Sequence, residues 1–239
     1  MSLLVSTTIY NDIIRYRLDL LGLNGSEFLS MIKSTGAKMA GSFPLQCILN
    51  DVYYKSDIDI FIDSLGNGYS LFDLYMFKMH PEYQIEFEYF FKHIVKSRQY
   101  IVSKARINVV CLSCDPTDFI NNTFDFSFCQ TYFTGDKLYY HPDTLNRSGF
   151  LVNDPIITIS SRHTRYIWYD NIKYTNIQDF IKCKLKLRMK KYMDRGFTIN
   201  MKHYLELKNE YNNEYERLTL IDMIPESITP LCVISEILI

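Results

Sequence analysis

Residues 57–62 constrain the fold more than any other part of the chain, because acidic and apolar side chains alternate along them. In a β-strand, alternate side chains point to the same face of the sheet. Asp57 and Asp59 would therefore share one face, while the isoleucines between and after them would pack on the other face. The pattern predicts a strand that holds two carboxylates side by side at its start.

The paired carboxylates admit two interpretations. Two neighbouring carboxylates repel each other, and each loses hydration beside an apolar strand. A bound divalent cation offsets both effects, and magnesium prefers one or two carboxylates together with substrate phosphates. The alternative is that Asp57 and Asp59 lie in water at the end of a strand. Taken alone, the motif favours this alternative, whereas its neighbours in the sequence favour the cation site.

Gly41 and Ser42 are the first of these neighbours, because they follow a predicted strand at residues 38–41 and precede an apolar, predicted helical segment at residues 42–49. A glycine lets the backbone approach a triphosphate. The serine hydroxyl and the N–H groups of a helix N-terminus can hold phosphate oxygens. This placement before the acidic strand indicates a phosphate-binding turn.

Asp125 is the second neighbour, because it lies in the alternating segment 124–133, which we expect to be a strand. An ionised aspartate inside an apolar strand is costly unless it is paired or bound to metal. An edge-strand acid that faces water is the alternative. A predicted strand at residues 107–112 is spaced to bring Asp125 beside Asp57 and Asp59. Three carboxylates around two cations suit in-line nucleotidyl transfer.

The remaining patterns predict helices interleaved with strands over the first 140 residues, which favours an α+β or α/β core with a mixed sheet and flanking helices. We expect a core at residues 1–150 and a basic, mainly helical region at 151–239 that packs on it. The other predicted elements are helices at 11–23, 26–36, 82–97, 116–121 and 176–195, a hairpin return at 137–140, and extended segments at 155–160 and 166–174.

Composition narrows the choice of partners. Hydrophobic residues make up 47% of the chain and charged residues 22%, which is typical of a globular protein. The net charge is only −1, so affinity for nucleic acid would have to come from a local basic patch. We see no signal peptide and no span long enough for a membrane, so we expect a cytoplasmic protein with buried, free cysteines.

The basic patch lies at residues 182–195, which carry seven lysines and arginines. On a helix, Lys184, Arg188, Lys191 and Arg195 share one face at i, i+4, i+7 and i+11. Such a stripe could contact a nucleoside triphosphate or the backbone of RNA or another polyanion. It could equally be a solvated helix face. The first part of the segment also alternates, which leaves a strand open.

Gly41-Ser42, the segment Ser56-Asp57-Ile58-Asp59-Ile60 and the later Asp125 together resemble the polymerase-β-type nucleotidyltransferase superfamily. The resemblance covers roughly residues 36–135. It departs from the superfamily in the gap between Ser42 and Asp57, which is longer than usual. The patterns Phe-Asp-x-Ser-x-Cys and Arg-x-x-Lys-Tyr-x-x-Arg-Gly-Phe also resemble members from large DNA viruses, which would place the chain in the cytoplasm of an infected cell.

The resemblance implies a nucleotidyltransferase that moves a nucleoside monophosphate from an NTP such as ATP to a hydroxyl acceptor. It implies that Asp57 and Asp59 bind two Mg²⁺ (or Mn²⁺) ions, that Asp125 holds the catalytic ion, and that Gly41 and Ser42 bind phosphates. An RNA 3′ end is the favoured acceptor; a protein or a small molecule is also open. The alternative is an inactive module that binds nucleic acid, nucleotide, a protein partner or a second copy of the chain. From the basic segment we add these nucleotide-binding candidates: Lys184, Arg188 and Lys191.

Overall fold

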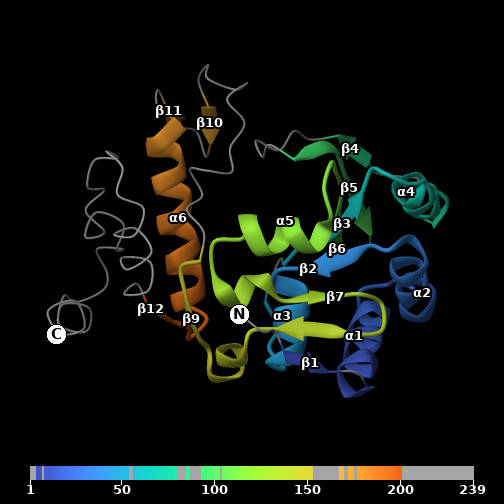
Figure 1. The fold of residues 1–239 in the computed structure, drawn as a ribbon, viewed down its shortest axis with the longest axis horizontal. Helices are drawn as coiled ribbons and strands as arrows, with labels where there is room; N and C mark the ends of the chain where they lie inside the picture. Colours follow the sequence, from blue (N-terminus) through green and yellow to red (C-terminus); the bar gives the residue numbers. More distant parts are fainter. Residues whose placement is uncertain are drawn as a thin grey trace, which may run out of the picture.

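The computed structural model describes residues 4–6, 8–53, 56–79, 84–86, 93–102, 104–152, 167–169, 172–174 and 177–200. An eight-stranded mixed sheet forms its centre, with the strand order β1-β8-β7-β2-β3-β6-β5-β4 (Figure 1). The strands of this sheet are β1 (Leu4–Ser6), β2 (Lys38–Ala40), β3 (Ile58–Asp63), β4 (Gln84–Glu86), β5 (Ile94–Val102), β6 (Ala105–Leu112), β7 (Tyr132–Phe133) and β8 (Leu138–Tyr140).

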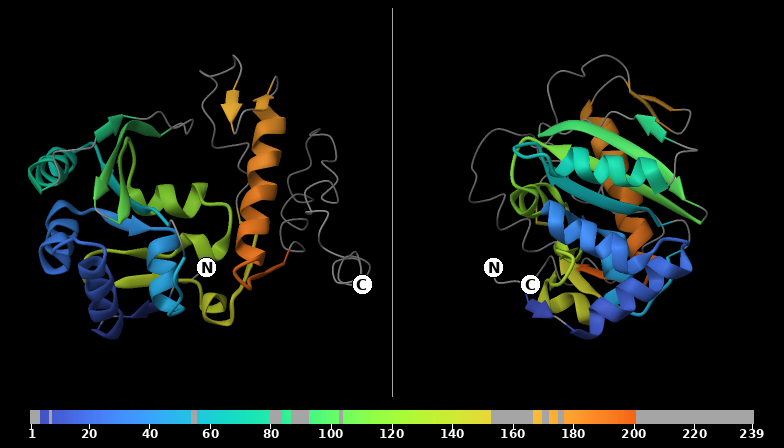
Figure 2. Two further views of the ribbon diagram at one scale, coloured as in Figure 1. Left: turned by 180° about the vertical axis from the view of Figure 1, so that it is seen from behind. Right: turned by 90° about the vertical axis from the view of Figure 1, so that its right-hand side faces the viewer.

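Six helices accompany the sheet in the described residues: α1 (Thr8–Leu20), α2 (Gly25–Thr35), α3 (Ser42–Ile48), α4 (Gly68–Met79), α5 (Pro116–Thr123) and α6 (Ile177–Met193). Helices α1, α2 and α4 cover one face of the sheet, where Ile58 and Ile60 of β3 join their core. Helix α5 packs on the other face, against Phe61 of β3 (Figure 2). The alternation along β3 therefore separates two cores, as the period of a strand requires.

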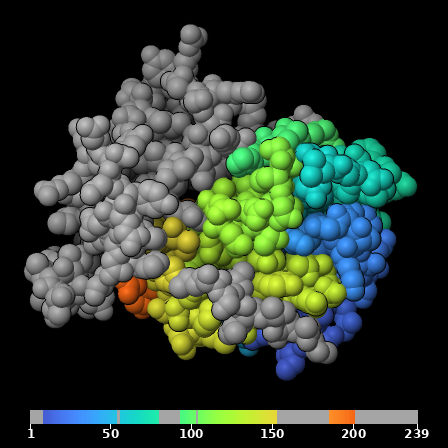
Figure 3. All heavy atoms as spheres, in the orientation of Figure 1, coloured from blue at the N-terminus to red at the C-terminus, as the bar shows by residue number. Residues whose placement is uncertain are grey.

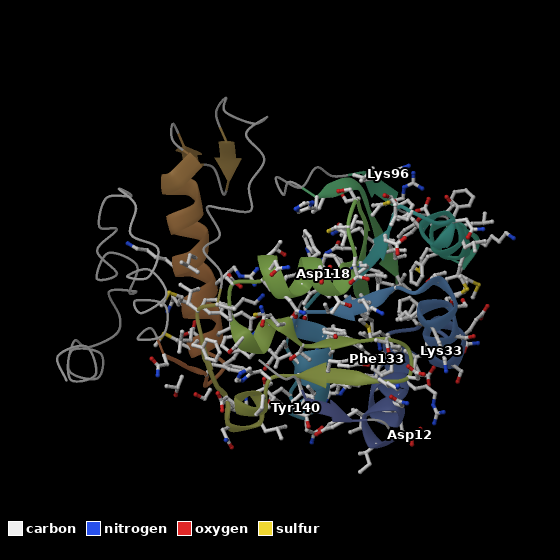
Figure 4. The ribbon with its side chains drawn as sticks, viewed as in Figure 1. Asp12, Lys33, Lys96, Asp118, Phe133 and Tyr140 are labelled. Atoms are coloured by element: carbon white, nitrogen blue, oxygen red, sulfur yellow. The ribbon has the colours of Figure 1, made fainter. Side chains whose placement is uncertain are left out.

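The turn between β7 and β8 packs against α2. Lys33 Nζ lies 2.9 Å from Asp136 Oδ2. Lys33 and Phe133 are labelled in Figure 4. Gly135 in this turn has φ +94, and a Cβ atom there would lie 2.8 Å from the carbonyl oxygen of Leu29. This position therefore requires glycine.

Helix α6 belongs to a second core beside the sheet. Its buried residues Leu185, Met189 and Tyr192 recur at i, i+4 and i+7 and pack with Phe126 and Phe128. The helix is followed by β12 (Thr198–Asn200), which pairs in parallel with β9 (Ser148–Phe150). The other short elements are a hairpin of β10 (Ile167–Tyr169) with β11 (Ile172–Tyr174) and the 3₁₀-helices η1 (Ser127–Gln130) and η2 (Pro142–Asn146).

Most of the predicted elements are confirmed, although their bounds shift by a few residues. The mixed sheet with flanking helices is confirmed as well. The basic segment forms helix α6 instead of the strand that its alternation left open. The segment at 155–160 and residues 201–239 lie outside the described residues, and the division into two regions at residue 150 stays a prediction. No helix among the described residues has the length and apolarity to cross a bilayer.

Two predictions of secondary structure are wrong. The helix expected at 82–97 is replaced, in its described part, by β4 and the start of β5, because β5 pairs along its length with β6. The strand expected at 124–133 starts after α5 has ended, with a bend at Asp125, continues as η1 and becomes a strand only at β7. Its alternating phenylalanines enter different cores: Phe124 contacts Phe61, whereas Phe126 stacks on Phe128. Helix α4 was not predicted, because Gly66-Asn67-Gly68 indicates only a turn.

Candidate functional site

The two aspartates lie where β3 enters the sheet. Asp57 directly precedes the strand, and Asp59 is its second residue. Asp59 is opposite Ala40 of the antiparallel strand β2 and opposite Asn108 of the parallel strand β6. Both aspartates are partly buried, whereas Ile58 between them is fully buried on the other face. The predicted sharing of one face is therefore confirmed.

Asp59 is held by a row of side chains that crosses three strands. Asn108 donates from Nδ2 to Asp59 Oδ1 at 2.7 Å, and Gln99 of β5 donates from Nε2 to Asn108 Oδ1 at 2.8 Å. The second bond fixes the orientation of the Asn108 amide, because only its NH₂ group is then left to face the carboxylate. Asp59 is thus anchored through one oxygen.

The charge on Asp59 is unfavourable in this position. Its pKa is raised to about 6, chiefly by burial and in smaller part by the neighbouring Asp57. The hydrogen bond from Asn108 and the positive charges of Arg188 and Lys191 act in the opposite direction, but they do not cancel the effect of burial. A bound cation would stabilise the ionised form of Asp59, which burial disfavours.

Asp57 has a cationic neighbour on the same face. Arg106 Nε of β6 lies 2.7 Å from Asp57 Oδ1, and the Arg106 side chain is half exposed. This oxygen is shielded from solvent, yet it accepts no hydrogen bond of regular geometry. The ion pair therefore leaves a buried acceptor of Asp57 without a well-directed donor.

Gly41 and Ser42 lie beside this carboxylate pair. Gly41 has φ +80, and a Cβ atom added there would lie 3.6 Å from Asp59 Oδ2. Its N–H donates to the carbonyl of Thr131 at 3.1 Å. The Ser42 hydroxyl is 2.5 Å from the hydroxyl of Ser56, which immediately precedes the acidic pair. The phosphate-binding role of Gly41 and Ser42 stays a prediction, but their position at the pair matches it.

Asp125 lies in a different environment from the one expected. It is in a bend after α5, and its side chain is only 8% exposed. Arg188 of α6 binds both of its oxygens, with Nε 2.7 Å from Oδ2 and Nη2 2.9 Å from Oδ1. The strand that was expected to bring Asp125 beside the aspartate pair does not form. The residue that faces Asp59 from the neighbouring strand is Asn108.

Helix α6 directs part of its basic face toward the aspartates. Arg188 and Lys191 are close enough to lower the pKa of Asp59. Arg195 follows the helix, and its guanidinium group lies over the ring of Tyr53 at 3.9 Å from the ring centre. Lys184 falls within α6, but its side chain lies outside the described residues. The nucleotide-binding role of Lys184, Arg188 and Lys191 stays a prediction.

Sequence reasoning missed Asn108, Gln99 and Arg106. A polar residue within an otherwise apolar strand was the available signal for Asn108. Its partner Gln99 could not be identified, because residues 82–97 were predicted to be a helix and the β5–β6 pairing was not foreseen. The position of Arg106 beside Asp57 follows from the parallel register of β3 and β6, and no local sequence pattern specifies that register.

The described residues offer no group of three or more His, Cys, Asp or Glu side chains that could hold a metal ion. Asp57 and Asp59 remain a pair. A pair fits one Mg²⁺ ion, because magnesium in such sites takes one or two carboxylates and completes its coordination with water and substrate phosphates. In the described contacts Arg106 lies at Oδ1 of Asp57 and Asn108 donates to Oδ1 of Asp59, so the second oxygen of each carboxylate would hold the cation.

Solved structures of CCA-adding enzymes share this fold. The Thermotoga maritima enzyme in complex with tRNA aligns with a TM-score of 0.54 and 17% identity over 87% of this chain and 46% of that chain. A CCA-adding enzyme in complex with ATP gives 0.55 and 16% over 93% and 49%, and a complex with CTP gives 0.54 and 16% over 92% and 49%. The fold is nucleotidyltransferase-like. The chain spans about half the length of these enzymes. No protein-family model and no curated protein matches it.

Proposed function

We propose that the chain is a metal-dependent nucleotidyltransferase that joins a nucleoside monophosphate from an NTP to a hydroxyl acceptor. One observation carries the proposal: Asp57 and Asp59 share a face at the start of a central strand, in a fold shared with enzymes solved with ATP and CTP. In the reaction, the acceptor oxygen attacks the α-phosphorus, the bond to pyrophosphate breaks, and the hydroxyl proton is lost to solvent or a base.

Each group of residues in the site would have its own role in this reaction. Asp57 and Asp59 would hold Mg²⁺ or Mn²⁺, which supplies charge stabilisation for the phosphates when it is bound. Gly41 leaves the second oxygen of Asp59 uncovered, because a side chain would approach it at contact distance. Arg188 and Lys191 supply positive charge opposite the aspartates, where a triphosphate would need it.

An RNA 3′ end is the acceptor that we favour. Support comes from the Thermotoga maritima enzyme, which was solved with tRNA. Helix α6 carries two further cationic residues on another side of the helix, the partly exposed Lys186 and the exposed Lys190. Contacts between such residues and phosphates would make RNA affinity depend strongly on salt. A protein hydroxyl and a small molecule are tested as alternatives in the same assay.

The test incubates the protein with each labelled NTP, Mg²⁺ or Mn²⁺, and an RNA oligonucleotide, and separates the products on a gel. We expect extension of the RNA, abolished by Asp59→Asn. A label on the protein itself would identify a protein acceptor. Absence of any transfer, or an activity that survives Asp59→Asn, would refute the proposal.

A second candidate, an inactive nucleotidyltransferase-like binding module, is favoured by one observation. Both oxygens of Asp125 are occupied by Arg188, so a third carboxylate does not join the pair. Such a module would bind ATP or RNA without transfer. Transfer in the assay above eliminates it, whereas ATP binding without transfer would establish it.

A further inference from the structure

The contact between Asp125 and Arg188 joins two segments that are 63 residues apart in the sequence. Asp125 lies buried in the bend directly after α5. Helix α5 and the segment after it form the green to yellow surface near the centre of Figure 3. Oδ1 of Asp125 accepts from the backbone N–H of Phe126 at 3.1 Å and from Arg188 Nη2 at 2.9 Å. Oδ2 is 2.7 Å from Arg188 Nε. A buried carboxylate is thus fully engaged by a bidentate arginine and a backbone donor.

This engagement makes Asp125 a poor ligand for a cation. Oδ1 already has two donors, which is the number that its lone pairs accommodate. A divalent cation at Oδ2 would lie next to the guanidinium charge of Arg188 and be repelled by it. If Arg188 moved away to admit a cation, the buried carboxylate of Asp125 would lose the ion pair that stabilises it.

Arg188 is held from both sides. Its helix is anchored in the second core by Leu185, Met189 and Tyr192, which lie on adjacent turns. Arg188 Nη2 also lies 3.8 Å from the sulfur of Cys129. Burial raises the pKa of this thiol to about 12, so it stays neutral and does not compete for the charge. Within the described part of the chain, Asp125 is therefore the anion that fixes the guanidinium group.

The same guanidinium group lies near the proposed nucleotide site, because its partner Asp125 adjoins Phe124, and a Cβ atom on Gly41 would lie 3.8 Å from the Phe124 ring and 3.6 Å from Asp59 Oδ2. Its charge acts on Asp59, and its side chain is 46% exposed, so it is accessible to a ligand. Among the contacts that the described part of the chain makes with Arg188, none involves Nη1. Nε and Nη2 of Arg188 thus bind Asp125, whereas Nη1 is left to bind an anion. An arginine fixed in this way loses little conformational freedom when it binds phosphate.

We propose that Asp125 is a positioning residue that holds Arg188 beside the aspartate pair, so that Arg188 binds the triphosphate of the NTP, and that Asp125 does not bind the metal. The inference rests on the proposed function and departs from the role that the superfamily resemblance implies for Asp125. It predicts that ATP binding and metal binding respond differently to the loss of this carboxylate.

The experiment measures Mn²⁺ alone by titration calorimetry, and ATP in excess Mg²⁺ by the same method, for the wild type, Asp125→Asn and Arg188→Gln. Salt is held at about 0.15 M, where charge effects beyond about 8 Å are screened. We expect Asp125→Asn to weaken ATP binding roughly three- to tenfold, because Arg188 must then be ordered by the ligand. Mn²⁺ affinity should change less than twofold.

The double variant Asp125→Asn/Arg188→Gln tests whether the two residues act as a unit. It should bind ATP no more weakly than Arg188→Gln alone, because Asp125 has nothing left to position. It also replaces the ion pair by a neutral amide pair of similar shape, which keeps the test available if Asp125→Asn does not fold. Asp73→Asn, which removes an aspartate paired with Arg98 at 2.6 Å, serves as the matched control and should leave both affinities unchanged.

Two results would overturn the inference. A tenfold or larger loss of Mn²⁺ affinity in Asp125→Asn, or in the double variant, would make Asp125 a metal ligand. Unchanged ATP affinity in a folded Asp125→Asn variant would reduce the pair to a structural contact. Failure of the wild type to bind both Mn²⁺ and ATP would instead refute the proposed function, and that result is distinguished from the others because it appears before any substitution.

Discussion

Asp59 should destabilise the metal-free protein at neutral pH, so its replacement by asparagine should stabilise the fold. Burial raises its pKa from an ordinary value of 3.8 to about 6. At ~1.4 kcal/mol per pH unit, the difference corresponds to roughly 3 kcal/mol in favour of the neutral side chain. Asparagine is neutral and keeps an oxygen for the Asn108 donor. Asp59→Asn should therefore raise the free energy of unfolding by up to about 3 kcal/mol near pH 7.5.

The sign of the pH dependence follows from the raised pKa. The folded state binds the Asp59 proton more tightly than the unfolded state, so the wild type gains stability as the pH falls through about 6 toward 3.8. At about pH 5, this protonation restores roughly half of that stability to the wild type, and the advantage of Asp59→Asn should fall by the same share. The other groups keep their side chains in both proteins, so the difference reports on Asp59 together with the charges that interact with it.

Urea titrations followed by circular dichroism, with a chelator present, measure this difference at both pH values. Asp12→Asn is the control, because Asp12 forms only an exposed ion pair with Arg15 on α1 and should change stability by less than about 1 kcal/mol. The reasoning is wrong if Asp59→Asn is no more stable than the wild type near pH 7.5, or if its advantage is the same at both pH values.

Three further outcomes can be checked in the same way. Gly41→Ala should lower the free energy of unfolding by about 1–3 kcal/mol in urea titrations, because φ +80 with ψ −137 is a conformation that side chains disfavour; Gly66→Ala, with no atom nearer than 4.0 Å, should be close to neutral. Asn108→Ala removes a donor that lowers the pKa of Asp59, so the loss of Mn²⁺ binding on acidification should begin at a higher pH than in the wild type, and an unchanged profile would contradict this. Phe128→Ala should cost about 3–5 kcal/mol and also weaken ATP binding, because Phe128 is fully buried in the core that anchors α6; full ATP affinity in a folded variant would contradict that link.

Local patterns were sufficient to predict the elements whose side chains follow one period. Strand β3 alternates between Ile58 or Ile60 in the core and Asp59 on the other face, and α6 buries Leu185 and Met189 one helical turn apart. The position of the aspartates and the direction of the basic face both follow from these periods. The part of the site that could be predicted is the part that a single element contains.

The rest depends on contacts between distant segments. Phe124, Phe126 and Phe128 have the spacing of a strand, yet Phe126 and Phe128 stack on each other in the second core and Phe124 packs against Phe61, so the segment forms η1. This tertiary packing overrides the local preference. The partner of Asp125 could not be read from the sequence either, because the bidentate contact with Arg188 requires the docking of α6.

The contact between Asp125 and Arg188 also bears on the order of folding. Closing a loop of 63 residues costs entropy before any contact repays it, whereas the hairpin of β5 and β6 closes within a few residues. The sheet that carries Asp57 and Asp59 can therefore form before α6 is in place, and during synthesis it leaves the ribosome first. We therefore expect the positive charges of Arg188 and Lys191 to reach the aspartates after the sheet has formed, when α6 docks.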